Sequence, residues 1–90
     1  MYRIKKYSYR QAAKLGVKIY PSSRPGKKID VYKRGLKVAT IGARGYYDFP
    51  TYAEKFGIEY AKKRRKLYHL RHAGNKKPGT PGFYASKILW

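Results

Sequence analysis

The fold of this chain is decided by the stretch IDVYKRGLKVATIG, residues 29–42. Two runs rich in β-branched residues flank Arg34-Gly35, which is the pattern of an antiparallel hairpin. A two-residue turn would set three cross-strand pairs, Lys33 with Leu36, Val31 with Val38 and Ile29 with Thr40. Lys37 would then lie opposite Tyr32, and one face would hold Ile29, Val31, Leu36 and Val38. Arginine is a poor residue for the positive φ of a type I′ turn, so a slightly longer loop is also open.

Segments on both sides extend this hairpin. Residues 16–20 (GVKIY) alternate apolar and polar side chains, which predicts a third strand. Residues 51–54 (TYAE) match the S/T-x-x-E capping box that starts a helix, and Gly57 predicts a break after it. Residues 58–72 contain no Pro or Gly and predict a basic helix that covers the sheet. Thr80-Pro81 predicts an N-cap followed by proline, and therefore a short C-terminal helix or docked tail.

The expected fold class is therefore α+β, a small antiparallel sheet of about three strands covered by a basic helix. Ninety residues allow one domain at most. We assign residues 16–90 to that domain, including the tail at residues 79–90. Residues 1–15 are expected to be a basic-aromatic arm, with a helical turn from Tyr9 to Leu15 that ends at Gly16.

The charge of the chain is its strongest functional signal. Twenty-three Lys and Arg face four Asp and Glu, a formal net charge of +19. Such a chain attracts polyanions: nucleic acid, acidic protein surfaces or anionic lipid headgroups. Cysteine is absent, which excludes disulfides and cysteine-ligated zinc. The sequence predicts neither a signal peptide nor a membrane-spanning run.

The candidate polyanion-binding residues are cations in two groups. The first surrounds a run of five consecutive cations on the predicted helix, and the second lies near the N-terminus. A solvated basic face or a localisation signal is the plainer interpretation of the run. The candidates are Lys62, Lys63, Arg64, Arg65, Lys66, Arg71, Lys76 and Lys77 in the first group, and Arg3, Lys5, Lys6 and Arg10 in the second.

Aromatic residues form a second set of candidates. The chain has 11 tyrosines, which can build a core, contact phosphates, stack on bases or serve an interface. The C-terminal Ile88-Leu89-Trp90 is expected either to close the core or to dock on a partner. The residues that we predict to dock on a partner are Tyr7, Tyr9, Phe83, Tyr84, Leu89 and Trp90.

Catalytic and metal sites have little support in the sequence. The four carboxylates, Asp30, Asp48, Glu54 and Glu59, are too few and too scattered for a two-metal nuclease. His69 and His72 are spaced i, i+3 but lack further ligands, and His72 is expected to cap the helix or make a core hydrogen bond. We therefore expect a non-enzymatic protein with no metal, cofactor or small-molecule substrate.

A combination of motifs resembles a largely uncharacterised family of short basic proteins encoded by large nucleocytoplasmic DNA viruses of algae and amoebae. The resemblance covers residues 16–90 and departs at Arg34-Gly35, where the family tends to have Asn-Gly. It implies a virion protein that is present in the infected host cell during assembly. The motifs are Pro21-Ser22-Ser23, Gly26-Lys27-Lys28, the hairpin, Tyr47-Asp48 with Thr51, residues 68–72 (YHLRH), residues 79–83 (GTPGF) and the final Leu89-Trp90.

Three hypotheses follow from the charge and the resemblance. The first is a non-enzymatic structural protein of the virion, a minor capsid component that bridges acidic surfaces of neighbouring capsid proteins through cationic and aromatic contacts. The second is a sequence-neutral nucleic-acid-binding protein that condenses a genome through phosphate contacts. The third is a ribosomal-type RNA-binding protein. Membrane contact also stays open.

Overall fold

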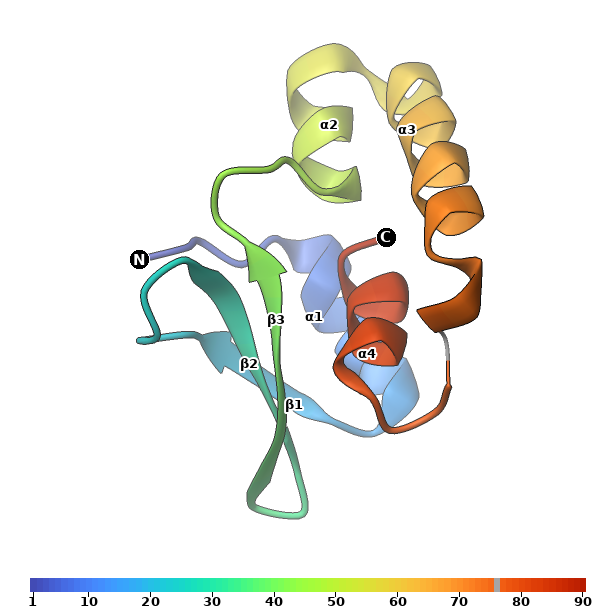
Figure 1. The fold of residues 1–90 in the computed structure, drawn as a ribbon. Helices are drawn as coiled ribbons and strands as arrows, with labels where there is room; N and C mark the ends of the chain where they lie inside the picture. The colour runs from blue at the N-terminus through green and yellow to red at the C-terminus, as the bar shows by residue number, and fades with distance from the viewer. Residues whose placement is uncertain (76) are drawn as a thin grey trace.

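The computed structural model describes residues 1–75 and 77–90 (Figure 1). In this part of the chain three strands form one antiparallel sheet in the order β1-β2-β3. The α+β class with a small sheet is confirmed. The elements, in chain order, are α1 (Lys6–Leu15), β1 (Lys18–Pro21), β2 (Lys27–Lys33), β3 (Leu36–Ala43), α2 (Phe49–Phe56), α3 (Ile58–Arg71), the 3-10 helix η1 (Ala73–Asn75) and α4 (Pro81–Ile88).

The hairpin has the predicted two-residue turn but not the predicted register. Arg34 and Gly35 both have positive φ, 53° and 80°, so arginine does adopt the left-handed conformation here. Lys33 lies opposite Leu36, and Tyr32 opposite Lys37, as expected. A bulge between Val31 and Tyr32 then shifts the ladder.

The bulge changes which residues of β3 face the core. Val31 pairs with Ala39 instead of Val38, and Ile29 pairs with Ile41 instead of Thr40. The expected apolar face is therefore wrong on β3, where Leu36 is 71% exposed and Val38 is 37% exposed. An extra residue in one strand reverses the alternation beyond it, so Ala39 and Ile41 turn inward.

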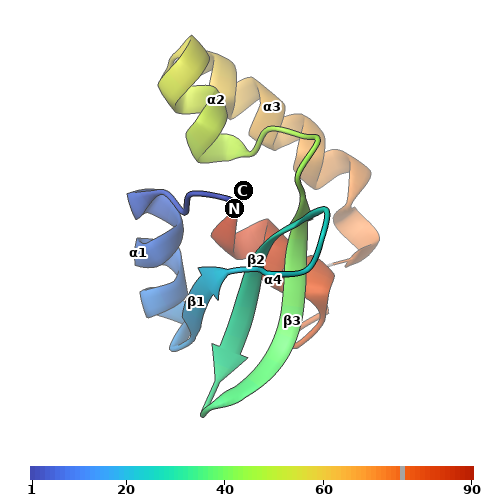
Figure 2. The ribbon, with the colours of Figure 1, turned by 90° about the vertical axis from the view of Figure 1, so that its left-hand side faces the viewer.

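Two helices cover the apolar face of the sheet (Figure 2). Helix α4 packs on β3, α1 packs on β1, and the two helices contact each other. The most deeply buried side chains come from the sheet and from the C-terminal segment: Ile29, Val31, Ile41, Ile88 and Leu89. Of the two alternatives predicted for the C-terminal segment, closing the core or docking on a partner, the structure shows that Ile88 and Leu89 close the core.

The basic helix does not cover the sheet as predicted. Helix α3 packs mainly against α2, away from the sheet (Figure 1). Ala61 is the only buried residue that the structure describes on α3, because cations occupy all sides of its middle turns. Without a continuous apolar stripe the helix cannot bury a face against the sheet.

Residues 1–15 are also more ordered than the predicted arm. Helix α1 starts at Lys6, three residues before the expected turn, and ends at Gly16 in the left-handed conformation. Ser8 and Ala12 are buried, and the Ser8 hydroxyl donates a hydrogen bond to the Ile88 carbonyl (2.9 Å). These small residues let α1 approach α4 closely, a feature that the many cations of the segment obscure in the sequence.

The helix boundaries follow capping chemistry. Helix α2 begins at Phe49 with Asp48 as its N-cap, so the capping box predicted at Thr51 is wrong. The break at Gly57 is confirmed, since α2 ends at Phe56 and α3 starts at Ile58. The Thr80 cap is confirmed as well, because its hydroxyl accepts a hydrogen bond from the Phe83 amide (3.2 Å).

Near the end of β3, Gly42 is required by the packing. Its φ is 82°, and a Cβ at this position would lie 2.8 Å from Leu89 Cδ1 and 2.9 Å from Lys28 Cδ. Gly42→Ala should therefore lower the free energy of unfolding by about 2–4 kcal/mol, from backbone strain together with overpacking. Urea denaturation followed by circular dichroism measures this. Gly45→Ala is the matched control because no atom lies within 4 Å of its added Cβ, and equal losses in the two variants would contradict the packing role.

Candidate functional site

A buried ion pair lies at the base of the candidate site. The Lys28 and Asp48 side chains are 5% and 1% exposed, and Lys28 Nζ lies 3.0 Å from Asp48 Oδ2. Lys28 Nζ also donates to the Tyr46 carbonyl (2.6 Å). Asp48 accepts hydrogen bonds from the Tyr2 hydroxyl (2.5 Å) and the Thr51 amide (3.0 Å). One carboxylate thus joins strand β2, the N-terminal segment and the start of α2.

The network fixes the protonation state of Asp48. Burial alone would raise the pKa of this carboxyl, but the hydrogen bonds from Thr51 and Tyr2 and the charge of Lys28 outweigh burial and lower the pKa below its ordinary value. Burial and the Asp48 carboxylate together raise the pKa of Tyr2. At neutral pH Asp48 is therefore an anion and Tyr2 a neutral hydrogen-bond donor.

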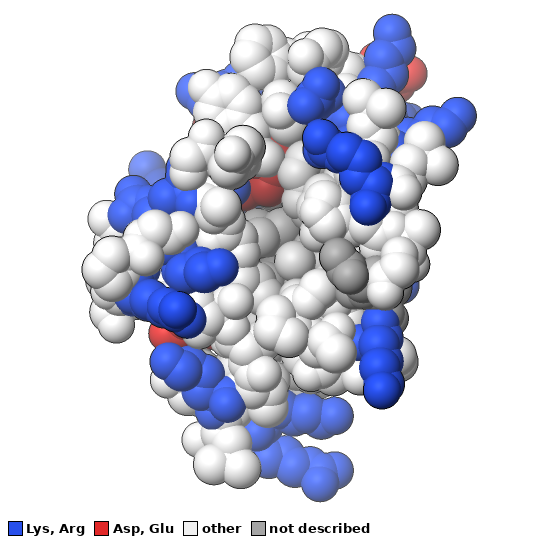
Figure 3. Space-filling view, in the orientation of Figure 1, with Lys and Arg blue, Asp and Glu red and all other residues white. Residues whose placement is uncertain are grey.

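Above this pair opens a pocket of about 620 Å³. It lies between the end of β3, the loop before α2, helix α3 and the C-terminus. Figure 3 shows it as a hollow with acidic atoms at its base and cations around it. The aromatic side chains that line it are Tyr46, Tyr47, Tyr52, Tyr68 and Trp90. The cationic or titratable side chains that line it are Lys28, Arg64, Arg71 and His72.

Stacked rings form one wall of the pocket. The Tyr68 and Trp90 rings are nearly parallel, with centroids 4.5 Å apart and an interplanar angle of 8°. His72 also stacks with Tyr68, at 4.2 Å and 19°. The Tyr7 hydroxyl donates to the Trp90 carbonyl (3.3 Å), which ties the C-terminus to α1. These contacts hold α3 against the rest of the protein through rings.

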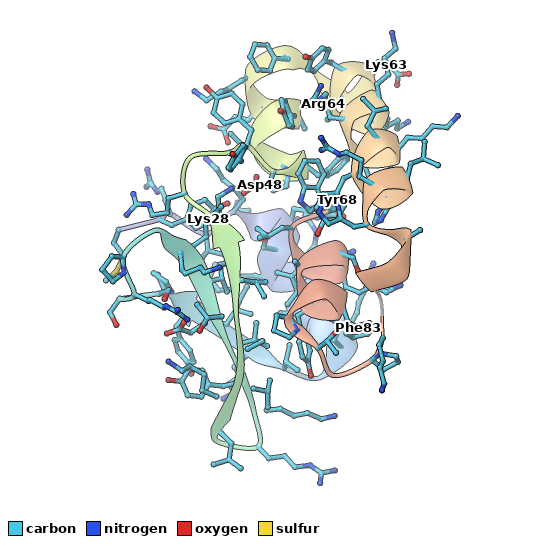
Figure 4. All side chains as sticks on the ribbon, viewed as in Figure 1. Lys28, Asp48, Lys63, Arg64, Tyr68 and Phe83 are labelled. Atoms are coloured by element: carbon cyan, nitrogen blue, oxygen red, sulfur yellow. The ribbon has the colours of Figure 1, made fainter. Side chains whose placement is uncertain are left out.

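The predicted cations of α3 separate into two directions. Arg64 lies over the Tyr52 ring (5.3 Å) and Arg65 over the Phe49 ring (4.1 Å), so both guanidinium groups face aromatic side chains. Lys62, Lys63 and Lys66 are exposed. Figure 4 shows Lys63 pointing away from the pocket and Arg64 pointing toward it. The five-cation run therefore contributes arginines to the side of α3 that faces the aromatic rings and lysines to its exposed side.

The other predicted cations are placed as follows. Arg71 lines the pocket, and Lys77 is exposed on the segment before α4. Lys76 lies outside the described residues. Near the N-terminus Arg3, Lys6 and Arg10 are exposed, whereas Lys5 forms an ion pair with Glu54 (2.9 Å). The structure thus brings Arg64 and Arg71 together and leaves the N-terminal cations outside the pocket.

The residues predicted to dock on a partner are mostly part of the chain's own core. Tyr84 and Leu89 are 5% and 1% exposed, so neither is accessible to a partner. Tyr7 packs against Phe49 (5.1 Å), Trp90 is half-buried in the ring stack, and Phe83 is half-buried beside the core. Tyr9, 49% exposed, keeps an accessible ring. The C-terminal segment is apolar because it forms part of the chain's own core.

Several residues of the site were not among the sequence candidates. In the sequence, Lys28 stands out only as part of the Gly26-Lys27-Lys28 motif, and Asp48 only as part of Tyr47-Asp48 and as one of four scattered carboxylates. The sequence Asp48-Phe49-Pro50 was an available signal, since aspartate is a favoured N-cap and proline is common in the first turn of a helix. The aromatic wall had no such signal, because 11 tyrosines are spread along the chain.

One of the two histidines, His72, caps a helix as the sequence predicts. His72 is the C-cap of α3, and its Nδ1 lies 3.0 Å from the Tyr68 carbonyl oxygen. Among the residues that the structure describes, no group of three or more His, Asp or Glu is placed to hold a metal ion. No described helix has the length and apolar character that crossing a membrane requires.

Comparisons with protein-family models, curated proteins and solved structures find no match to this chain. Its function is therefore inferred from the chemistry of its own surface and pocket.

The contribution of the buried Lys28–Asp48 pair to folding stability can be tested by mutation. Asp48→Asn leaves the Lys28 charge buried without an anion, and should lower the free energy of unfolding at pH 7 by about 3–5 kcal/mol. Because folding lowers the pKa of Asp48, its contribution is complete above the unfolded value of about 4 and is lost as the pH falls through the folded pKa. The wild type and Asp48→Asn should therefore converge in stability once the pH has fallen below the folded pKa of Asp48. Urea denaturation from pH 7 to pH 2 measures this.

Asp30→Asn is the control for that series. Asp30 accepts a hydrogen bond from Thr40 (2.9 Å), but its lysine partner Lys37 lies 3.9 Å away and is half-exposed. Asp30→Asn should therefore lower the free energy of unfolding by about 1 kcal/mol. A loss at Asp30 as large as that at Asp48 would contradict the central role of the buried pair.

Proposed function

We propose that this protein binds nucleic acid without sequence preference, through contacts of Lys and Arg with phosphates, in a non-enzymatic role. The observation that carries the proposal is the way the chain uses its acids. Each of the four carboxylates is already held by a lysine: Lys5–Glu54, Lys28–Asp48, Lys37–Asp30 and Lys62–Glu59. The net charge of +19 therefore has to be neutralised from outside the chain.

The arrangement of the cations supports a long polyanion. Lys and Arg side chains project from several separate parts of the visible outline of the molecule in Figure 3. Lys63 and Lys66, spaced i, i+3 on the exposed side of α3, can contact successive phosphates of one strand. Lysine contacts of this kind carry affinity without reading bases, and each releases counterions from the nucleic acid.

Exposed apolar residues favour a second candidate, the bridging minor capsid component of a virion. Leu67 and Leu70 on α3 are 46% and 66% exposed. They lie i, i+3 beside Lys63 and Lys66, so a partner with an apolar patch rimmed by acids would match this surface. The virion setting comes from the resemblance to proteins of large DNA viruses. Tyr84 and Leu89 no longer support this candidate, since both are buried in the chain's own core.

The first candidate predicts salt-sensitive binding to duplex DNA. The observed association constant should fall steeply with salt, and Lys62→Gln/Lys63→Gln/Lys66→Gln should reduce the log–log slope by about two to three. Fluorescence anisotropy with a labelled duplex from 50 to 300 mM salt measures it. Lys18→Gln/Lys33→Gln/Lys37→Gln removes the same charge from the sheet and should change the slope less. No binding at 50 mM salt would refute the proposal, and equal effects would refute the role of α3.

The second candidate predicts a different phenotype. Leu67→Asn/Leu70→Asn should leave duplex binding within about threefold, because the change removes apolar surface and leaves the net charge of +19 unaltered. The same variant should fail to enter assembled virus particles if α3 docks on a capsid protein. Mass spectrometry of purified particles from cells expressing tagged variants measures incorporation. Normal incorporation would rule out α3 as the docking surface.

A further inference from the structure

We infer that the aromatic pocket holds one unpaired nucleotide, with its base against the rings and its phosphate at the arginines, so that the protein prefers single-stranded to duplex nucleic acid. This inference rests on the proposed function and adds a site to it. The phosphate contacts of α3 need no pocket, and a duplex could satisfy them. The pocket is a separate feature on the other side of the same helix.

The size of the pocket suits this ligand. Its volume of about 620 Å³ lies within the 300–1,000 Å³ range of small-molecule sites and can accommodate a base, sugar and phosphate. A base pair within a duplex could not enter, because the base is stacked on both sides and joined to its partner. An unpaired base can leave its stack and present a face to an aromatic side chain.

The walls supply a surface for a base. Tyr68 is sandwiched between Trp90 (4.5 Å) and His72 (4.2 Å), so this rigid stack offers a base its outer rings and not the Tyr68 ring. Tyr52 adjoins this stack, since it contacts Trp90 (6.1 Å) and carries Arg64 over its ring (5.3 Å). Tyr47 lies beside Tyr52 (5.4 Å). Tyrosine and tryptophan rings bind any base by its π-face, which predicts stacking without sequence preference.

The charge inside the pocket selects an anion. Lys28 is not available to the ligand, because Asp48 and the Tyr46 carbonyl already occupy its ammonium group. The remaining fixed cations are Arg64 and Arg71, which come from α3. Their spacing of seven residues places both on one side of the helix, two turns apart. A phosphate linked to the bound base can lie between a guanidinium and the solvent.

The lining of the pocket explains why the ligand should carry both an aromatic base and a phosphate. A purely apolar ligand would leave the arginines unpaired, and inorganic phosphate would leave the rings uncovered. The neutral Lys28–Asp48 pair offers no further charge. A base with its attached phosphate satisfies the rings and the arginines together.

Trp90 is the single tryptophan of the chain and lines the pocket, so its fluorescence reports on occupancy. We expect a 5′-phosphorylated trithymidylate to quench it saturably. Thymidine monophosphate should do so more weakly, since a strand adds contacts outside the pocket. Thymidine without phosphate should bind at least tenfold more weakly than the monophosphate. Inorganic phosphate should not quench, and quenching by it equal to that by the monophosphate would overturn the inference.

Variants separate the pocket from the general charge. Arg64→Gln should weaken trithymidylate binding about five- to tenfold. Arg71→Gln, made as a separate variant, should have an effect of the same size. Arg24→Gln removes the same charge from an exposed loop and should change it less than twofold. Circular dichroism of each variant confirms folding. Equal losses in all three would overturn the inference, since charge alone would then explain binding.

The two proposals fail in different ways. Duplex binding with the expected salt slope, but without a preference for single strands and without quenching of Trp90, would overturn the nucleotide pocket and leave the proposed function intact. The absence of binding to duplex and single strand alike would overturn both.

Discussion

The structure depends on the buried ion pair between Lys28 and Asp48. Removing two charges from water is unfavourable by several kcal/mol for each ion, and the loss is recovered only when both are paired and hydrogen-bonded. Here the pair is complete, since Lys28 also donates to Tyr46, and Asp48 also accepts from Tyr2 and Thr51. In a chain with only four acids, one of them is placed where it joins the sheet, the N-terminal segment and helix α2. The direction of α2 sets the position of α3, and so the pocket between α3 and the sheet.

Aromatic rings solve a second problem, which is how a helix with so many cations can pack at all. Helix α3 has no apolar stripe, and its contact with the core runs through Tyr68, stacked on Trp90. Arg64 and Arg65 lie over the Tyr52 and Phe49 rings, where the negative face of the ring offsets part of their charge. The same rings that hold the helix also line the pocket, so the high tyrosine content serves packing and surface chemistry at once.

Local chemistry was predictable from the sequence, and long-range choices were not. The turn at Arg34-Gly35, the break at Gly57 and the cap at Thr80 each follow from residues within a few positions. The bulge beside Val31 depends on which strand residues the covering helices can bury, and no local signal marks it. Helix α1 was predicted only as a turn from Tyr9 to Leu15 on an arm, because its buried face consists of the small residues Ser8 and Ala12.

The candidate site divides along the same line. Arg64 and Arg71 were identified from charge alone, while Lys28 and the ring wall depend on contacts between segments far apart in the chain. Tyr68 and Trp90, for instance, are 22 positions apart in the sequence and meet as parallel rings. Charge in a sequence indicates what class of partner a protein attracts. It does not indicate which cations share a pocket, because that depends on the helix rotation that packing selects.

The high charge also links binding to stability. Arg64 and Arg71 line one pocket, while the nearest acid at its base is already neutralised by Lys28. An anion bound at either guanidinium would offset part of the surrounding positive charge. A ligand that binds only the folded form stabilises it by mass action. Under the proposed function, the excess of positive charge, which weakens the free chain, is therefore also the property through which a polyanion would stabilise the folded state.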